Sequence, residues 1–146
     1  SVELRNTDAA VSFGGDPASP HTTGKFFADV EMFTNGPGGG DYETYLRGWL
    51  CSEVSGPDNG WLSGNSSRYC SAEYDAMADQ LSTTSDADER AAIAIAMNDH
   101  LVQHGVIIPL IFRGSVSAHS NSLEGVWMNG GWDSEMWNIA EWSRAE

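Results

Sequence analysis

Two histidines have a spacing that could support metal chemistry. His100 and His104 lie four residues apart in a segment with helical periodicity, so both could face one metal ion. Helical zinc hydrolases have a Glu beside the first His, whereas here the neighbours are Asp99 and Leu101, and no third ligand is indicated. We therefore predict no metal site and expect both histidines to face solvent.

Two cysteines form the second candidate pair. Cys51 and Cys70 lie 19 residues apart with turn-forming residues between them, and no histidine is close in sequence. Two thiols are too few for a four-ligand zinc site. In an exported protein they would pair, and closing such a loop would stabilise the fold by about 3 kcal/mol. Two separate buried thiols are the alternative.

Patterns typical of catalysis are weak in this sequence. Residues 113–117 lack the second glycine of a nucleophile elbow, and the glycines at 36–40 lack the Gly-Lys-Ser/Thr ending of a phosphate loop. Asp58-Asn59-Gly60 lacks the remaining spacing of a calcium loop and indicates a turn. With 21 acidic residues, a glycosidase pair can arise by coincidence. The sequence therefore predicts no enzyme, with a hydrolase using paired acids as a rival hypothesis.

Aromatic residues surround the cysteine pair. Trp49, Trp61, Tyr69 and Tyr74 lie in or beside a stretch rich in Asn, Ser and Gly. Aromatic faces combined with adaptable polar groups suit the binding of peptides or sugars. In the alternative interpretation, Trp49 and Tyr74 belong to the core and Trp61 anchors a loop.

Composition limits the class of partner. The chain has 146 residues, 7 Lys+Arg and 21 Asp+Glu, a formal net charge of −14 and a pI near 4.3. Nucleic acids and anionic membranes would repel it. Apolar residues make up 40%, which argues against general disorder, and the longest apolar run has seven residues, far short of a membrane span.

Three helices should position these residues. The apolar spacing predicts them over residues 41–46, 72–82 and 85–104. Asp41 and Ser71 are typical N-caps, Ser85 with Asp88 resembles a capping box, and Gly105 is suited to end the last helix.

Extended segments are expected around the helices. Alternating or apolar runs predict strands at residues 2–5, 26–33, 106–112, 115–119 and 126–128. The run 106–112 has the composition of a strand buried on both faces, and Pro109 would place it at a sheet edge. The fold class is therefore α/β, or α+β for this chain taken alone.

The order of these motifs resembles that of the family 5 extracellular solute-binding proteins, which are the oligopeptide, dipeptide and nickel receptors of bacterial ABC importers. The residues that carry the resemblance are Gly-Trp-Leu-Cys at 48–51, Asn-Ser-Ser-Arg-Tyr-Cys-Ser-Ala-Glu-Tyr-Asp at 65–75, and the segments 89–90, 106–110, 116–118, 123–126 and 133–142. They cover nearly the whole chain in consistent order.

The resemblance implies a two-lobed periplasmic-binding-protein type II architecture, with a mixed sheet and flanking helices. Family members are several times longer, so we expect a C-terminal fragment. Residues 1–114 would be most of the C-terminal lobe, and residues 115–146 the segment returning to the N-terminal lobe. That segment carries four tryptophans whose partners would be missing, so the fragment should pack locally, swap or dimerise. With only one wall of the cleft, it should bind solute weakly or not at all.

The resemblance also implies a function. The lobes would close on a small solute, a peptide or an oligosaccharide, and deliver it to a membrane permease without a cofactor. The full-length form would be periplasmic or extracellular and tethered as a lipoprotein. The alternative is a stand-alone carbohydrate-binding module that uses exposed tryptophans such as Trp49 and Trp61.

Site residues follow from matching positions. Trp49 corresponds to a tryptophan that lines the family's ligand cavity. Peptide receptors have an Asp three residues later to hold the ligand's amino group, whereas this chain has Ser52 followed by Glu53. A sugar therefore becomes a fair alternative ligand. Trp61 and Tyr69 complete the expected ligand-binding set, and the family match implies a Cys51–Cys70 disulfide.

Overall fold

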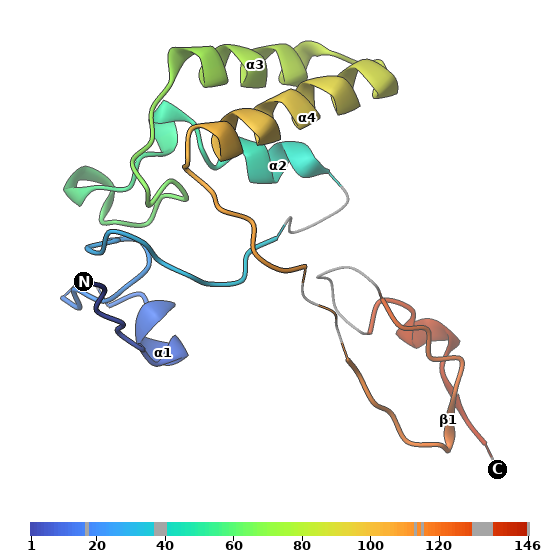
Figure 1. Cartoon of the computed structure of the whole chain (residues 1–146). Coiled ribbons are helices and arrows are strands. Elements are labelled where there is room, and N and C mark those ends of the chain that lie inside the picture. Colours follow the sequence, from blue (N-terminus) through green and yellow to red (C-terminus); the bar gives the residue numbers. More distant parts are fainter. Residues whose placement is uncertain (17, 37–40, 113, 115, 130–135, 146) are drawn as a thin grey trace.

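The computed structural model describes residues 1–16, 18–36, 41–112, 114, 116–129 and 136–145 (Figure 1). This part of the chain is a mixed α/β arrangement of helices and one two-stranded sheet. Its α-helices are α1 (Ala9–Ser12), α2 (Tyr42–Arg47), α3 (Ala72–Thr83) and α4 (Ala87–Gln103). Short 3-10 helices are η1 (Cys51–Glu53), η2 (Pro57–Asn59) and η3 (Ile139–Glu141), and the strands are β1 (Leu123–Glu124) and β2 (Ser143–Arg144).

The three predicted helices are confirmed as α2, α3 and α4, with one corrected cap. Asp41 caps α2 by accepting a hydrogen bond from the backbone N–H of Glu43, and Ser71 caps α3. The predicted capping box at Ser85 is wrong. The cap of α4 is Asp86, whose carboxylate accepts two backbone N–H groups of the first turn. A carboxylate can accept both orphan donors at once, so Asp86 replaces the Ser85 hydroxyl.

The core lies where α2, α3 and α4 pack together (Figure 1). Its buried members come from one face of each helix and from the turn after α2: Leu46, Leu50, Tyr74, Ala78, Leu81, Ile93, Met97 and Leu101. The spacings i, i+4 and i+7 or i+8 along α3 and α4 place these side chains on facing stripes. Arg90 fastens the layer, since its guanidinium donates hydrogen bonds to Glu43 of α2 and to the carbonyl of Leu81.

The predicted strands do not form in the described residues, where β1 and β2 are the only paired strands. Residues 106–112 follow α4 as extended chain, and only Val106 and Ile107 pack against the core. Ile111 is 88% exposed and Phe112 is 95% exposed, so the expectation of burial on both faces is wrong. A strand exists only where a neighbour supplies the ladder of hydrogen bonds, and no described segment pairs with this run. Residue 115 of another predicted strand lies outside the described residues.

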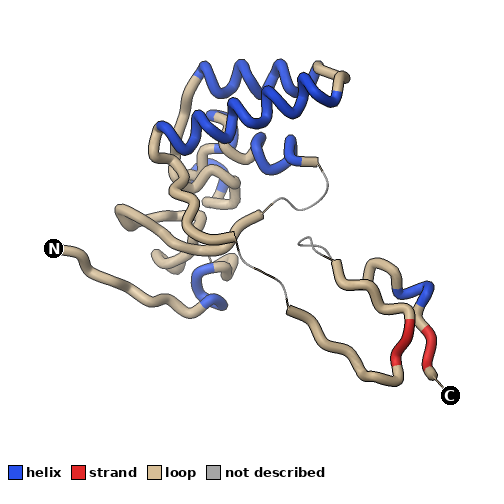
Figure 2. The backbone as a smooth tube through the Cα atoms, turned by 45° about the vertical axis from the view of Figure 1, so that its right-hand side comes forward, coloured by secondary structure: helices blue, strands red, loops and turns tan. Residues whose placement is uncertain are grey.

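The C-terminal part forms a small hairpin of its own. Leu123 of β1 pairs with Arg144 of β2, and the buried side chain of Asn138 bonds the carbonyl of Gly125 and the indole N–H of Trp142. In both backbone views the hairpin lies apart from the helices (Figure 2). Trp132 and residues 133–135 lie outside the described part.

No helix in the described residues combines the length and the apolar composition required to cross a membrane.

Candidate ligand-binding site

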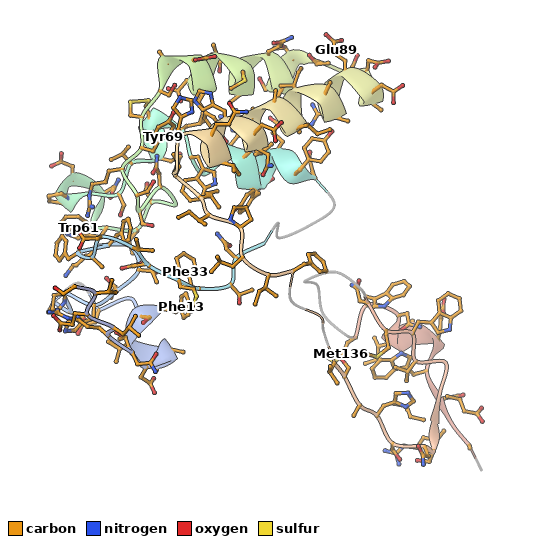
Figure 3. All side chains as sticks on the ribbon, in the orientation of Figure 1. Phe13, Phe33, Trp61, Tyr69, Glu89 and Met136 are labelled. Carbon is orange, nitrogen blue, oxygen red and sulfur yellow. A yellow bond between two sulfur atoms is a disulfide. The ribbon has the colours of Figure 1, made fainter. Side chains whose placement is uncertain are left out.

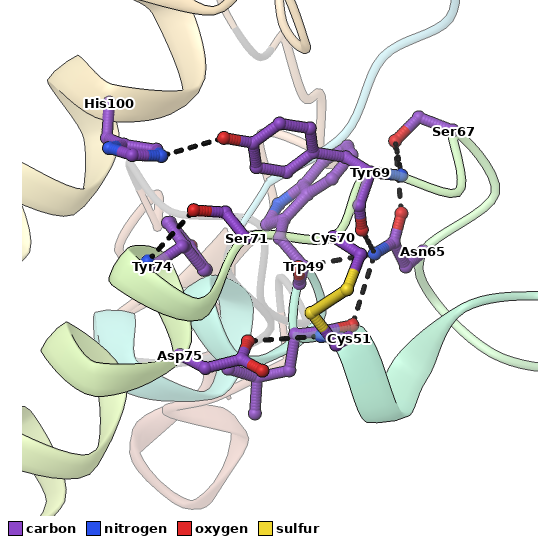
Figure 4. The surroundings of a disulfide bond; sticks show 11 residues. Trp49, Cys51, Asn65, Ser67, Tyr69, Cys70, Ser71, Tyr74, Asp75 and His100 are labelled. Carbon is purple, nitrogen blue, oxygen red and sulfur yellow. Dashed lines mark hydrogen bonds between the residues drawn. A yellow bond between two sulfur atoms is a disulfide. The ribbon is translucent and has the colours of Figure 1, made fainter.

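The Cys51–Cys70 disulfide is confirmed (Figure 4). It joins the first residue of η1 to the residue before the cap of α3, with the two Cα atoms 4.5 Å apart. The backbone N–H of Cys51 also donates to the carboxylate of Asp75, at 3.1 Å. The disulfide loop, residues 51–70, is therefore fastened to the start of α3 by one covalent bond and one hydrogen bond.

Asn65 organises the inside of the disulfide loop (Figure 4). It is fully buried, and its side-chain amide donates to the carbonyls of Trp49, Leu50 and Tyr69 at 3.2, 3.1 and 2.7 Å. Its side-chain oxygen accepts the hydroxyl of Ser67. Buried amides and carbonyls are costly when unpaired, so this network fixes the backbones on both sides of the disulfide. The sequence carries no signal for this role, because an Asn in a Gly/Ser-rich stretch resembles an ordinary turn residue.

Trp49 and Tyr69, two of the predicted ligand residues, are held against the helical core. Trp49 is partly buried there and packs edge-on against Tyr45, with ring centroids 6.4 Å apart. The Tyr69 hydroxyl lies 2.7 Å from Nε2 of His100. Both side chains thus take part in packing, as the core interpretation of Trp49 expects, and each keeps part of its surface accessible.

The histidine pair belongs to this packing. His100 is 8% exposed, stacks on His104 with ring centroids 4.1 Å apart, and contacts the rings of Tyr69 and Tyr74. The expectation that both histidines face solvent is therefore wrong for His100, because α4 turns it toward α3. Burial also raises the pKa of Tyr74, whose hydroxyl donates to the carbonyl of Leu46. Within the described residues, no group of three or more His, Cys, Asp or Glu side chains could hold a metal ion.

Ser52 and Glu53 lie on η1, at the opening of the disulfide loop. Ser52 is exposed, and the backbone carbonyl of Glu53 accepts the N–H of Asn65. The Glu53 carboxylate is 3.5 Å from the hydroxyl of Ser63, at the limit of a hydrogen bond. The Glu53 side chain therefore lies toward Ser63, near the far end of the loop.

Trp61 lies at that far end, in a cluster with Arg68 and Phe27. The Arg68 guanidinium sits 5.3 Å from the Trp61 ring and 5.8 Å from the Phe27 ring, and the two rings meet edge to face at 5.5 Å. Arg68 also donates hydrogen bonds to the backbone carbonyls of Lys25 and Phe26. Cation–π stacking and these bonds attach the N-terminal segment to the disulfide loop.

Backbone strain is concentrated at this cluster. Phe26, Trp61 and Arg68 have φ angles of 41°, 65° and 59°, and they are the only non-glycine residues with positive φ in the described part of the chain. Such conformations persist only where surrounding contacts impose them, and they are often found at ligand sites. No sequence pattern indicated this strain.

Glu31 lies on the same N-terminal segment. One of its carboxylate oxygens is buried without a hydrogen-bond partner. Burial raises the pKa of this carboxyl, and the positive charge of Arg68 partly offsets the rise.

Two open pockets lie between the N-terminal segment and the disulfide loop, with volumes of about 250 and 280 Å³. The first is lined by Ser12, Phe13, Gly14, Gly15, Asp16, Thr22, Thr23, Gly24, Lys25, Gly60, Trp61, Leu62 and Ser63, and the second by Phe13, Thr23, Gly24, Phe33, Thr34, Asn35, Ser63, Gly64 and Ser66. Of the five predicted ligand residues, only Trp61 lines either pocket. Figure 3 shows Trp61 on the same side of the molecule as Phe13 and Phe33, with Tyr69 nearer the helices.

The chain matches no known protein-family model, and searches of curated proteins and of solved structures give no match. What it binds therefore has to be inferred from its own residues.

Proposed function

We propose that this chain belongs to the solute-binding component of an ABC import system. It captures a peptide or similar small solute without covalent chemistry and presents it to a membrane permease. In this proposal residues 1–114 serve one lobe and residues 115–146 the other, on the periplasmic or extracellular side of the membrane. The proposal rests on the family resemblance of the sequence, whose motifs occur in consistent order along the chain.

One structural observation carries the proposal furthest. Two motifs of the resemblance, residues 48–51 and 65–75, are fastened to each other by the disulfide and by the Asn65 network. This unit holds the aromatic residues Trp49 and Tyr69 on a rigid support and leaves part of each accessible. A preorganised aromatic wall is what a solute receptor needs, because little entropy is then lost when the ligand binds.

A second candidate function is a carbohydrate-binding module, and it is favoured by exposed tryptophans. Trp127 and Trp137 of the C-terminal hairpin are 61% and 54% exposed, with ring centroids 6.4 Å apart. Exposed indole rings form platforms on which sugar rings stack. A module of this kind would bind insoluble polysaccharide directly, without a permease.

Calorimetry can separate these functions. The complete protein, expressed from the reading frame that encodes this sequence, is titrated with mixed tri- to pentapeptides and with soluble oligosaccharides. The receptor proposal predicts one solute per protein with a Kd of about 1 μM, and weaker binding by about 100-fold or more to the 146-residue chain alone. Retention on cellulose or chitin without binding to any soluble solute would favour the second candidate and overturn the first.

A variant pair locates the site in the same experiment. Trp61→Ala should weaken solute binding by at least about 10-fold, because Trp61 is the one expected ligand residue that lines a pocket. Trp137→Ala removes an exposed indole of the hairpin and serves as the matched control. The receptor proposal fails if only the Trp137 variant loses binding.

A further inference from the structure

The two pockets lie side by side on the surface. They share the lining residues Phe13, Thr23, Gly24 and Ser63. We call this feature the hydroxyl groove and define it by the lining residues of both pockets given above. The volumes of the two pockets, about 250 and 280 Å³, are each slightly below the range of about 300–1,000 Å³ that is usual for small-molecule sites.

Contacts within the N-terminal wall and between the two walls fix the shape of the groove. The backbone N–H of Thr23 donates to the carbonyl of Ser12 at 2.8 Å, which closes the N-terminal wall on itself. A side chain at Gly24 would collide with the carbonyl of Trp61 on the opposite wall, so the walls approach closely at this glycine. The Arg68 stack attaches the same two walls beyond that point. The groove is therefore preorganised rather than formed by the ligand.

The lining is rich in uncharged hydrogen-bonding groups. Its hydroxyls belong to Ser12, Thr22, Thr23, Thr34, Ser63 and Ser66, and Asn35 adds an amide. Thr22 is only 8% exposed. Phe13, Phe33 and Trp61 supply apolar surface beside these groups. Hydroxyls next to aromatic rings complement a molecule that carries both hydroxyls and C–H faces.

The charged side chains of the lining already form hydrogen bonds with nearby backbone groups. The Asp16 carboxylate accepts the backbone N–H of Ala18 at 2.9 Å, and the Lys25 ammonium donates to the carbonyl of Ser19 at 2.7 Å. Lys25 is also only 7% exposed, so its charge is poorly placed to meet a ligand carboxylate. Among the described lining residues, the one positive and the one negative charge cancel. A free peptide, which carries both an ammonium and a carboxylate, would find neither end well paired.

We propose that the hydroxyl groove binds an uncharged oligosaccharide of two or three sugar rings. This inference rests on the proposed receptor function, because it names the solute class that the receptor would take. Sugar hydroxyls exchange hydrogen bonds with the serine and threonine hydroxyls, and a C–H face of one ring packs on the aromatic residues.

The test is calorimetric titration of the full chain with maltotriose, cellotriose and trialanine, each at millimolar concentration. The probe variant combines Thr23→Val with Ser63→Ala, which removes the two hydroxyls common to both pockets without adding bulk. Neutral hydrogen bonds of this kind make the double variant bind a trisaccharide about 10-fold more weakly. The matched control combines Ser82→Ala with Thr83→Val, two exposed hydroxyls at the end of α3. It should leave binding unchanged, and thermal melting monitored by circular dichroism confirms that both variants fold.

Each outcome of the titration supports or overturns the oligosaccharide inference. Trisaccharide binding that weakens only in the groove variant supports the inference. Binding of trialanine but of neither trisaccharide overturns the sugar assignment and leaves the receptor function standing. Trisaccharide binding that is equal in both variants places the site outside the groove and overturns the inference. If none of the three probes binds, the groove inference is overturned, and the titration of the complete protein with mixed peptides and oligosaccharides decides the receptor function separately.

Discussion

Asn65 shows how a single amide can determine the structure of a whole loop. Its NH₂ group donates hydrogen bonds to three backbone carbonyls that come from both sides of the disulfide, so all three carbonyls depend on this one group for a hydrogen-bond partner. The disulfide alone would leave the backbone between its ends free to vary. The amide and the disulfide together therefore set the positions of the Trp49 and Tyr69 backbones.

Asn65→Ala should lower the free energy of unfolding by at least about 2 kcal/mol, because it leaves buried carbonyls unpaired. Urea denaturation followed by tryptophan fluorescence measures this loss. Asn98→Ala changes an exposed asparagine on α4 and should stay within about 0.5 kcal/mol of the parent. Equal stability of the two variants would contradict the assigned role of Asn65.

The raised pKa of the Glu31 carboxyl predicts that the stability of the fold depends on pH. Burial raises its pKa above the ordinary value of 4.5, so the folded state favours the protonated form. The protonated carboxyl stabilises the folded state fully at pH values below 4.5, and this stabilisation is lost as the pH rises through the raised pKa of the folded state. Glu31→Gln should therefore stabilise the fold at pH 7 and have little effect at pH 4, as measured by urea denaturation at both values.

The control for Glu31 is Glu124→Gln, which removes one negative charge from an exposed position. Any general benefit of lowering the net charge appears in both variants. The difference between them isolates the buried carboxyl. A stabilisation at pH 7 that is equal in both variants would show that burial of Glu31 has no part in it.

Among the elements, the start of α4 depends on which residue caps its first turn. Asp86→Ala should destabilise the chain by about 1 kcal/mol, because two backbone N–H groups of the first turn lose their acceptor. Ser85→Ala should change stability by less than about 0.5 kcal/mol, since the Ser85 hydroxyl does not cap the helix. Thermal denaturation of both variants measures the difference. A larger effect at Ser85 would restore the capping box that the sequence suggested.

Helices were predictable here because their signals are local. Caps, apolar stripes and the terminal Gly105 at φ 67° all act within a few residues, and α2, α3 and α4 appear where these signals occur. Strands were not predictable, since a run such as residues 106–112 becomes a strand only beside a partner. Local sequence therefore specified the helical core and left the extended segments undetermined.

The candidate site was predictable only in part, for a related reason. The aromatic composition of the disulfide loop followed from residue types, whereas the Cys51–Cys70 pairing was expected only for an exported protein and from the family resemblance. The Arg68 stack and the hydroxyl groove depend on the N-terminal segment folding back onto the disulfide loop, as in the contact of Arg68 with Phe26, 42 residues away in sequence. Contacts at such a distance leave no periodic pattern in a single chain.

For the whole molecule, exposed apolar surface is opposed by charge. Ile108, Leu110, Ile111 and Phe112 are between 66% and 95% exposed, while the net charge is −14. Apolar contact favours association of two copies, and like-charge repulsion opposes it. Salt screens the repulsion and leaves the apolar term intact.

Raising NaCl from about 20 to 500 mM should therefore increase the fraction of dimer measured by analytical ultracentrifugation. Combining Ile111→Ser with Phe112→Ser should reduce that fraction at high salt. Ile95→Ser with Val102→Ser alters exposed apolar residues on α4 and should have a smaller effect. If salt dissociates the dimer instead, association is electrostatic and the exposed run does not drive it.

Lys25 is the only lysine in the sequence, and its amine is almost inaccessible beside the groove. An acylating reagent should therefore modify the α-amino group at once and Lys25 only during transient opening of the N-terminal wall. Mass spectrometry of the timed reaction would therefore measure how often the N-terminal wall of the groove opens. A ligand bound in the groove should slow the acylation of Lys25.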